Sequence, residues 1–177
     1  ATTAAKTALE QLAGERDYYG FLAADKLGRS YSFNHDYLEI TAASPVTSLP
    51  ALQRIEELNF HNNDMLAQSE WFKVLQDTAD RGQLQDLALL ASQKGWYRMA
   101  IDAATRAEAW DALDQRFPIP FQSIFEQYAA AQQVPKSELL AIARRESAFF
   151  PGAESPVGAR GLMQIMPATG ASVAISL

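Results

Sequence analysis

The chain has 177 residues, of which 48% are hydrophobic and 20% charged, a composition typical of a folded globular protein rather than a disordered one. Lys and Arg total 15 against 21 Asp and Glu, and the net charge of -6 argues against binding to nucleic acid through overall charge. The sequence has no cysteine, which excludes disulfide scaffolds, Cys-based zinc sites and thiol nucleophiles. No run approaches the roughly 20 apolar residues of a membrane span, so we expect no membrane-spanning helix.

The first two thirds of the chain show helical patterns interrupted by glycines. Residues 4–28 are rich in Ala and Leu and predict one or two helices, with Gly28 as a C-terminal cap. Residues 29–50 look irregular. From residue 51 onward, apolar residues recur at spacings of three and four, and these helices are expected to stop at Gly82 and Gly95. Short helices separated in this way predict stacked helical hairpins, the architecture of an α-superhelix.

The best candidate for a domain boundary is the segment RFPIPFQ at residues 116–122, because its two prolines disfavour helix continuation. We therefore divide the chain into a helical region, 1–115, and a second region, 116–177. In the second region, the segments 121–133 and 134–150 each predict a helix, with Pro135 near the first turn of the latter. No segment shows the sustained alternation of a strand, so the predicted fold class is all-α.

The helix predicted after Pro135 contains one carboxylate at an unusual position. Its apolar stripe, read at spacings of three and four, consists of Leu139, Ile142, Ala143, Glu146 and Phe150. Glu146 is therefore expected on a buried face, where an unpaired carboxyl group tends to keep its proton and can serve as a general acid. Spacing alone does not distinguish such an acid from a buried glutamate that is paired with Arg145, Arg160 or a helix end.

The segment after this helix favours a ligand site. "PG" at 151–152 and "SPVG" at 155–158 are turn signals, and Gly158 and Gly161 let another group approach the main chain closely. The run Leu162–Met166 then offers an apolar surface with a single amide, Gln164. Such a mixture suits a sugar, which needs a flat apolar contact and a few amide or hydroxyl partners.

Together these residues resemble a known family. The segment AIARRESAFFPGAESPVGARGLMQIMPATG, at 141–170, resembles the catalytic core of the soluble lytic murein transglycosylases, which have a goose-type-lysozyme-like fold. Glu-Ser at 146–147 and GARGLMQIMP at 158–167 carry the match. The likeness is strong from about Trp110 to Gly170, and the helical hairpins before it resemble the family's α-superhelical scaffold more loosely. The resemblance implies stacked helical hairpins followed by the opening helices of a lysozyme-like domain.

The resemblance also implies an activity. Members of this family cleave the β-1,4 bond between N-acetylmuramic acid and N-acetylglucosamine in periplasmic peptidoglycan without adding water, which leaves a 1,6-anhydro ring. By carry-over, Glu146 protonates the glycosidic oxygen and then acts as base on the C6 hydroxyl, with the substrate's N-acetyl group stabilising the positive charge. Ser147 is expected to hydrogen-bond near Glu146 or the sugar, and Gly161, Leu162, Met163 and Gln164 to contact the glycan. The implied chemistry needs no metal or cofactor.

The last residue, Leu177, lies thirteen positions after Gln164 (177 minus 164). The later motifs of the family, an Ala-Tyr-Asn-Ala-Gly type segment and a tyrosine facing the acid, are not in the sequence. We therefore expect an incomplete lysozyme-like domain that is inactive by itself. Two other functions stay open: a hydrolase on the same fold, with Glu154 as a second acid, and a helical scaffold in which residues 1–115 do the work.

Three further groups have plainer interpretations. His35 and His61 are not joined by any metal-ligand spacing, so we expect ordinary surface or structural roles for them. Glu154 lies in a turn-rich loop and more often caps or stays solvated than acts in catalysis. Arg144, Arg145 and Arg160 either meet carboxylates of the peptidoglycan peptides or form ion pairs with Glu146 or Glu154.

Overall fold

A computed structural model of the chain describes residues 3–40 and 44–176, and the regular secondary structure in these ranges is entirely helical. The all-α prediction is therefore confirmed. The chain divides into two compact units, residues 1–37 and 38–177. In the described ranges, no helix is both long and apolar enough to cross a lipid bilayer.

The first unit is a pair of helices, α1 (Thr3–Leu12) and α2 (Tyr18–Leu27). Asp17 caps α2, because its carboxylate accepts a hydrogen bond from the Gly20 amide at 2.7 Å. Gly20 has to be a glycine, since a Cβ at this position would lie 2.0 Å from the Glu15 carbonyl oxygen. Gly28 ends α2 in the left-handed conformation, with φ 62°, which confirms the predicted cap.

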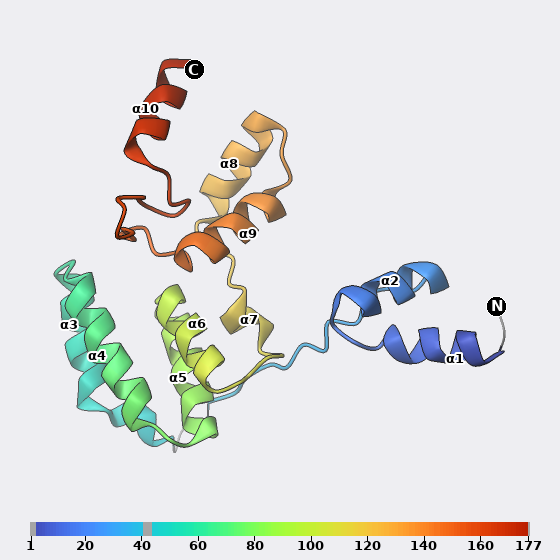
Figure 1. Cartoon of the computed structure of the whole chain (residues 1–177). Helices are drawn as coiled ribbons and strands as arrows, with labels where there is room; N and C mark the ends of the chain where they lie inside the picture. The colour runs from blue at the N-terminus through green and yellow to red at the C-terminus, as the bar shows by residue number, and fades with distance from the viewer. Residues whose placement is uncertain (1–2, 41–43, 177) are drawn as a thin grey trace. The chain divides into compact units, whose positions relative to one another are not determined.

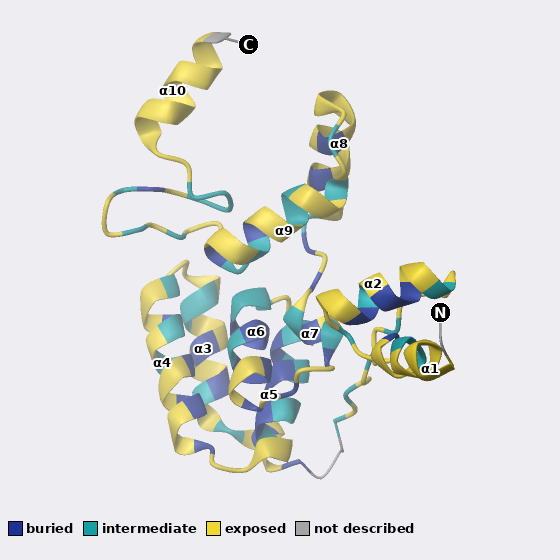
Figure 2. Ribbon diagram, turned by 45° about the vertical axis from the view of Figure 1, so that its right-hand side comes forward, coloured by how far each residue is buried: buried dark blue, intermediate teal, exposed yellow. Residues whose placement is uncertain are grey.

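The second unit begins with a stack of short helices. They are a 3-10 turn η1 (Pro45–Ser48), α3 (Pro50–Phe60), α4 (Asp64–Asp77), α5 (Arg81–Gln93), α6 (Tyr97–Arg106) and α7 (Leu113–Arg116). In Figure 1, α3 pairs with α4 and α5 pairs with α6, as expected for helical hairpins. Their facing sides form one large core around the fully buried Trp71, Ile55 and Leu87. Figure 2 shows the buried residues gathered on these inner faces.

One predicted helix end is wrong. The helix expected to stop at Gly82 ends instead at Asp77, and Gly82 lies inside the first turn of α5. Asp80 decides the start of α5, because its side chain accepts a hydrogen bond from the Gln83 amide at 2.8 Å. Gly95 does follow the end of α5 in the left-handed region, with φ 72°, as predicted.

Helices resume after the two prolines of residues 116–122. They are α8 (Gln122–Gln132), α9 (Lys136–Ser147) and α10 (Pro167–Ser176), and α8 packs against α9. Directly after α9, both Ala148 and Phe149 adopt left-handed backbone conformations, with φ 51° and 62°. Such angles are costly for a residue as bulky as Phe. Burial of the Phe149 ring offsets this cost; the ring lies edge-on to that of Phe125, with the centroids 6.4 Å apart.

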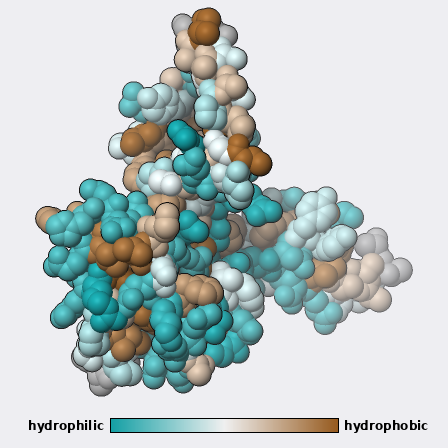
Figure 3. All heavy atoms as spheres, turned by 60° about the vertical axis from the view of Figure 1, so that its left-hand side comes forward, coloured by the Kyte–Doolittle hydropathy of each residue, from teal (hydrophilic) through white to brown (hydrophobic). Residues whose placement is uncertain are grey.

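The region from α8 to α10 has a small core. Its buried apolar residues are Ile101 from α6, Phe125, Ala143 and Phe149. Residues 165–175 are all exposed, and α10 is yellow along its described length in Figure 2. Figure 3 shows brown apolar side chains at the surface of the molecule. The large exposed apolar residues of this region are Ile124, Tyr128, Ile142, Val157, Ile165, Met166, Val173 and Ile175.

Candidate functional site

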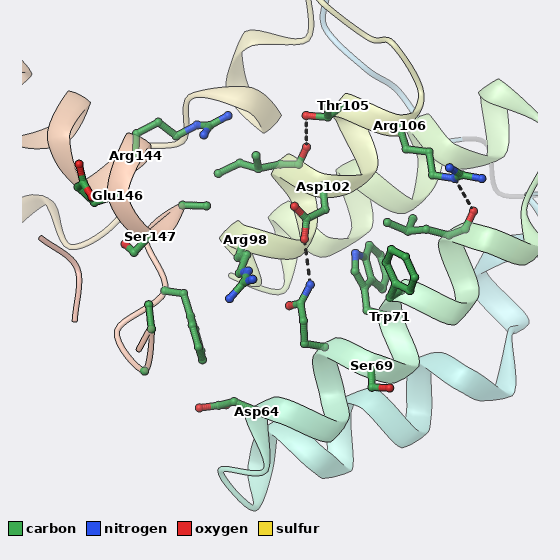
Figure 4. A pocket seen from close by; sticks show the side chains of 18 of the residues that line it. Asp64, Ser69, Trp71, Arg98, Asp102, Thr105, Arg106, Arg144, Glu146 and Ser147 are labelled. Atoms are coloured by element: carbon green, nitrogen blue, oxygen red, sulfur yellow. Dashed lines mark hydrogen bonds between the residues drawn. The ribbon is translucent and has the colours of Figure 1, made fainter. Parts of the chain in front are cut away.

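A groove of about 1450 Å³ lies within the second unit. One wall consists of α4 and α6, and the other consists of the end of α9 and the loop after it (Figure 4). Glu146, Ser147 and Gln164 line the second wall, so the groove receives residues from both sequence motifs of the predicted site. Residues far apart in sequence, 64–110 and 144–164, thus meet in one cavity.

Ser147 joins the two motifs. Its side chain is buried, and its hydroxyl lies 2.9 Å from the Leu162 carbonyl oxygen and 3.1 Å from the Ala143 carbonyl oxygen. A hydroxyl has one hydrogen, so the two carbonyls share or alternate this donor. The bond to Leu162 ties the last turn of α9 to the turn formed by residues 161–164. Ser147 therefore contacts the protein backbone, and its predicted role beside the sugar stays a prediction.

The turn at residues 161–164 is fixed by its own amide. Gly161 and Gln164 have φ values of 74° and 48°, and the Gln164 side-chain nitrogen donates to the carbonyl oxygens of Ala153 and Gly161, each at 3.0 Å. Both amide hydrogens are thereby used within the loop. The side-chain carbonyl oxygen of Gln164 has no hydrogen-bond partner among the described residues, so this atom is left to accept a hydrogen bond from a ligand. Leu162 and Met163 pack against the small core around Ala143 and Phe149.

Glu146 is exposed, and the prediction that it lies on a buried face is wrong. The buried face of α9 follows Ala143 and Ser147. Successive residues of a helix are rotated by about 100°, so Glu146 lies on the flank of that face rather than at its centre. Ile142, another member of the predicted stripe, is 44% exposed for the same reason. Glu146 nevertheless lines the groove, on the side of α9 turned away from Asp102 in Figure 4.

The arginines beside the site have separate partners. Arg160 forms an ion pair with Glu154 at 3.1 Å, which confirms one of the pairings left open by the sequence. The Arg144 side chain donates from Nε to the Arg116 carbonyl oxygen at 2.6 Å. Glu146 has no ion-pair partner within the described ranges. The pairing of an arginine with Glu146, which the sequence left open as an alternative, is therefore not formed in the described part of the chain.

The opposite wall contains a carboxylate that sequence reasoning missed. Asp102 on α6 accepts a hydrogen bond from the Gln68 side chain at 2.9 Å. Burial raises the pKa of the Asp102 carboxyl above its ordinary value, while the Gln68 hydrogen bond and the charges of Arg98 and Arg144 oppose this shift. A perturbed carboxyl in a groove is a frequent feature of functional sites.

A sequence signal for this wall exists. The residues of α6 that are not buried between positions 98 and 106 are Arg98, Asp102, Thr105 and Arg106. Their spacing of four, three and one places them on one narrow face of an otherwise buried, Ala-rich helix. A polar stripe of this kind on a short helix indicates a face turned toward solvent or a ligand. The groove is where this stripe points.

The two histidines occupy different units. The His35 ring stacks on Tyr37 with centroids 4.0 Å apart, and His61 lies 3.9 Å from the Glu57 carboxylate. Within residues 3–40 and 44–176, no three His, Cys, Asp or Glu side chains gather as a metal site would require.

Comparison with protein families gives two matches along the chain. A family model described as the soluble lytic murein transglycosylase L domain matches residues 45–113. A second, described as the transglycosylase SLT domain, matches residues 123–177. The groove therefore has one wall in each matched segment.

Curated relatives agree with these matches. The chain is 38% identical over 165 residues to the soluble lytic murein transglycosylase of Escherichia coli (strain K12), an alignment that covers 93% of this chain and 25% of that protein. The protein of the same name from Salmonella typhimurium is 37% identical over 165 residues, with the same coverage. The chain thus spans about a quarter of the length of these relatives.

Solved structures of similar proteins superpose closely on this chain. A 70-kDa soluble lytic transglycosylase in complex with bulgecin A has a TM-score of 0.88 and 35% identity, and the match covers 98% of this chain and 28% of that one. An inactive mutant of the lytic transglycosylase Slt from Pseudomonas aeruginosa gives 0.89 and 34%, over 99% of this chain and 29% of that one. The chain therefore belongs to the soluble lytic murein transglycosylase family.

Proposed function

We propose that this chain carries the acid-bearing wall of a site that cleaves peptidoglycan as a lytic transglycosylase. The observation that carries the proposal is the hydrogen bond from the Ser147 hydroxyl to the Leu162 carbonyl oxygen, at 2.9 Å. It holds Glu146 and the Gly161–Gln164 turn beside one groove, and a glycosidase needs an acid next to a surface that holds the sugar. The family membership supports the same function.

The proposed reaction uses one protein carboxyl group. Glu146 gives its proton to the glycosidic oxygen between N-acetylmuramic acid and N-acetylglucosamine as the bond to the anomeric carbon breaks. The substrate's N-acetyl group stabilises the positive charge, which replaces the second carboxylate of most glycosidases. Glu146 then takes the proton of the C6 hydroxyl as that oxygen attacks the anomeric carbon, so no water enters the product.

The other predicted site residues receive distinct roles in this proposal. Ser147 fixes the last turn of α9 to the Leu162 carbonyl. The side-chain carbonyl oxygen of Gln164 accepts a hydrogen bond from an amide or hydroxyl group of the glycan. Leu162 and Met163, which are partly buried, offer apolar contact. Gly161 keeps the turn tight through its left-handed backbone. The substrate in this proposal is the glycan strand of peptidoglycan, and the place of action is the periplasm.

The exposure of Glu146 favours a second candidate function for this segment, a glycan-facing scaffold without turnover of its own. Attack by the C6 hydroxyl has to exclude competing water, and an exposed acid excludes it poorly. In both cases we place the division between the scaffold helices and the lysozyme-like region at residues 115 and 116. The prolines at 118 and 120 and the ends of the two family matches support this division.

The test is digestion of purified glycan strands followed by mass spectrometry of the ends. We expect anhydro ends, lighter by one water than hydrolytic ends, from a protein in which these residues stand within a complete lysozyme-like domain, and none from its Glu146→Gln variant. Glu138→Gln is the matched control, because Glu138 is an exposed carboxylate on the same helix, and it should retain activity. Ends that carry the added water would identify a hydrolase. Binding of strands without any cleavage would identify the scaffold.

A further inference from the structure

Four side chains alternate between aromatic rings and guanidinium groups at the junction of α7 and α9. The Arg116 guanidinium lies 5.0 Å from the ring centroid of Trp110 and 5.0 Å from that of Phe117. The Arg144 guanidinium lies 5.6 Å from the Phe117 ring centroid. We call this series of Trp110, Arg116, Phe117 and Arg144 the cation–π ladder. It connects the segment after α6 with the helix that carries Glu146.

Hydrogen bonds reinforce the cation–π ladder at two points. Arg116 donates to the Trp110 carbonyl oxygen at 2.6 Å, and Arg144 donates through Nε to the Arg116 carbonyl oxygen at 2.6 Å. The planar guanidinium can stack and donate at once, which an ammonium group cannot do in the same geometry. Arg144 is therefore held in one orientation by a ring and by a backbone acceptor.

The groups around Arg144 have opposing effects on its charge. Burial and the neighbouring charge of Arg116 lower the pKa of Arg144, whereas Asp102 opposes this shift from the other wall of the groove. Two like charges on either side of one ring would separate without compensation. Figure 4 shows Arg144 extending from α9 in the direction of α6, while Glu146 points the other way. The two residues thus use opposite sides of the same helical turn.

We infer that Arg144 is a positioning residue, which fixes α9 to α7 through the cation–π ladder and thereby sets where Glu146 stands at the groove. The inference rests on the proposed function in so far as Glu146 is the acid. Residues 144 and 146 lie within one turn of a continuous helix, so a tilt or rotation of α9 at Arg144 moves Glu146 with it. Misplacement of a reacting group by about 1 Å is enough to lower a rate substantially.

The test combines hydrogen exchange with turnover. Amide exchange of peptides from residues 136–150 is measured by mass spectrometry in the protein and in the variants Arg144→Gln, Arg144→Lys and Arg145→Gln. Arg145 is the matched control, an exposed arginine on the same turn that is outside the cation–π ladder. Loss of the stack and its hydrogen bond in Arg144→Gln should speed exchange roughly ten- to a hundredfold. Arg144→Lys should recover part of the protection, and Arg145→Gln should leave it unchanged.

Turnover, measured in a protein with a complete lysozyme-like domain, separates positioning from stability. We expect Arg144→Gln to lower kcat with little change in KM, because glycan contacts remain while the acid is misplaced. Equal exchange in the Arg144 and Arg145 variants, or faster exchange with an unchanged kcat, would overturn the inference. If exchange responds as expected but the unsubstituted protein yields no cleaved glycan, the joint between α7 and α9 stands and the proposed function fails. Should Arg144→Gln not fold, the variant Phe117→Leu removes only the aromatic ring, and its exchange and turnover test the inference in the same way.

Discussion

The two parts of the second unit are stabilised in different ways. The helices α3 to α7 bury a continuous core of Leu, Ile, Val, Ala and the fully enclosed Trp71. The core of the region from α8 to α10 consists of Phe125, Ala143 and Phe149, together with Ile101 from α6. There, turns and specific hydrogen bonds fix the backbone, as at Ser147 and Gln164. The scaffold is therefore stabilised mainly by apolar packing, whereas the backbone of the candidate site is held by individual polar contacts.

Because the two parts are stabilised differently, substitutions in them should affect stability over different ranges of the chain. In the scaffold, a large side chain contributes through the volume that it fills, so truncation should lower the stability of the whole unit. In the site region, removal of one hydrogen bond should loosen a short segment while the scaffold stays folded. The following substitutions test this contrast, in order of decreasing expected effect.

Truncation of Trp71 should have the largest effect. Its ring is completely buried, and its indole nitrogen donates to the Met99 carbonyl oxygen at 3.1 Å, which links α4 to α6. We expect Trp71→Ala to lower the free energy of unfolding by about 3–5 kcal/mol. Urea denaturation measures it, with the adjacent Phe72→Ala as the matched control, because Phe72 is 60% exposed. Equal losses for the two variants would contradict a packing-dominated scaffold.

Removal of the Ser147 hydroxyl should have a smaller and more local effect. Ser147→Ala deprives the Leu162 carbonyl of its side-chain donor, at a cost of about 1–3 kcal/mol to the local structure. Hydrogen exchange should therefore accelerate in peptides covering residues 158–166 and stay unchanged in α4 and α5. Ser137→Ala, an exposed serine on the same helix, is the control. Uniform acceleration across the second unit would show that the two regions are not separable.

Asp102 should give a smaller effect that depends on pH. Burial raises its pKa in the folded protein, so the unfolded chain loses this proton first as pH rises. The free energy of unfolding therefore falls between the ordinary value of 3.8 and the higher folded value. Asp102→Asn lacks this titration, so its stability relative to the unsubstituted protein should increase from acidic to neutral pH. Denaturation curves across this range measure it, and a decrease would reverse the sign that we infer.

The smallest effect is expected for Glu126, which forms an exposed ion pair with Lys136 at 2.7 Å. Hydrogen bonds from Lys136 and Gln122 lower the pKa of the Glu126 carboxyl in the folded protein. Its contribution is therefore present above the ordinary value of 4.5 and is lost as pH falls through the lower folded value. Glu126→Gln and Lys136→Met should lower Tm slightly and equally at neutral pH. A loss that salt does not reduce would argue against an exposed pair.

Sequence patterns predicted the scaffold better than the site. Helical spacings predicted the hairpins, because paired helices bury the faces that carry the apolar stripes, and the two prolines predicted the interruption of helix between α7 and α8. The same reasoning failed for Glu146, since the true buried face of α9 is rotated toward Ser147. It also missed Asp102, which becomes a neighbour of α9 only through tertiary packing. The stop expected at Gly82 was wrong because the Asp80 cap determines where α5 begins.

The most direct test of the account is a crystal structure of the Glu146→Gln variant with a short peptidoglycan glycan fragment. We predict the glycosidic oxygen within about 3 Å of the residue 146 side chain, with the sugar lying against Leu162, Met163 and Gln164. A fragment bound on the helices α3 to α5, with residue 146 out of hydrogen-bond reach, would contradict it.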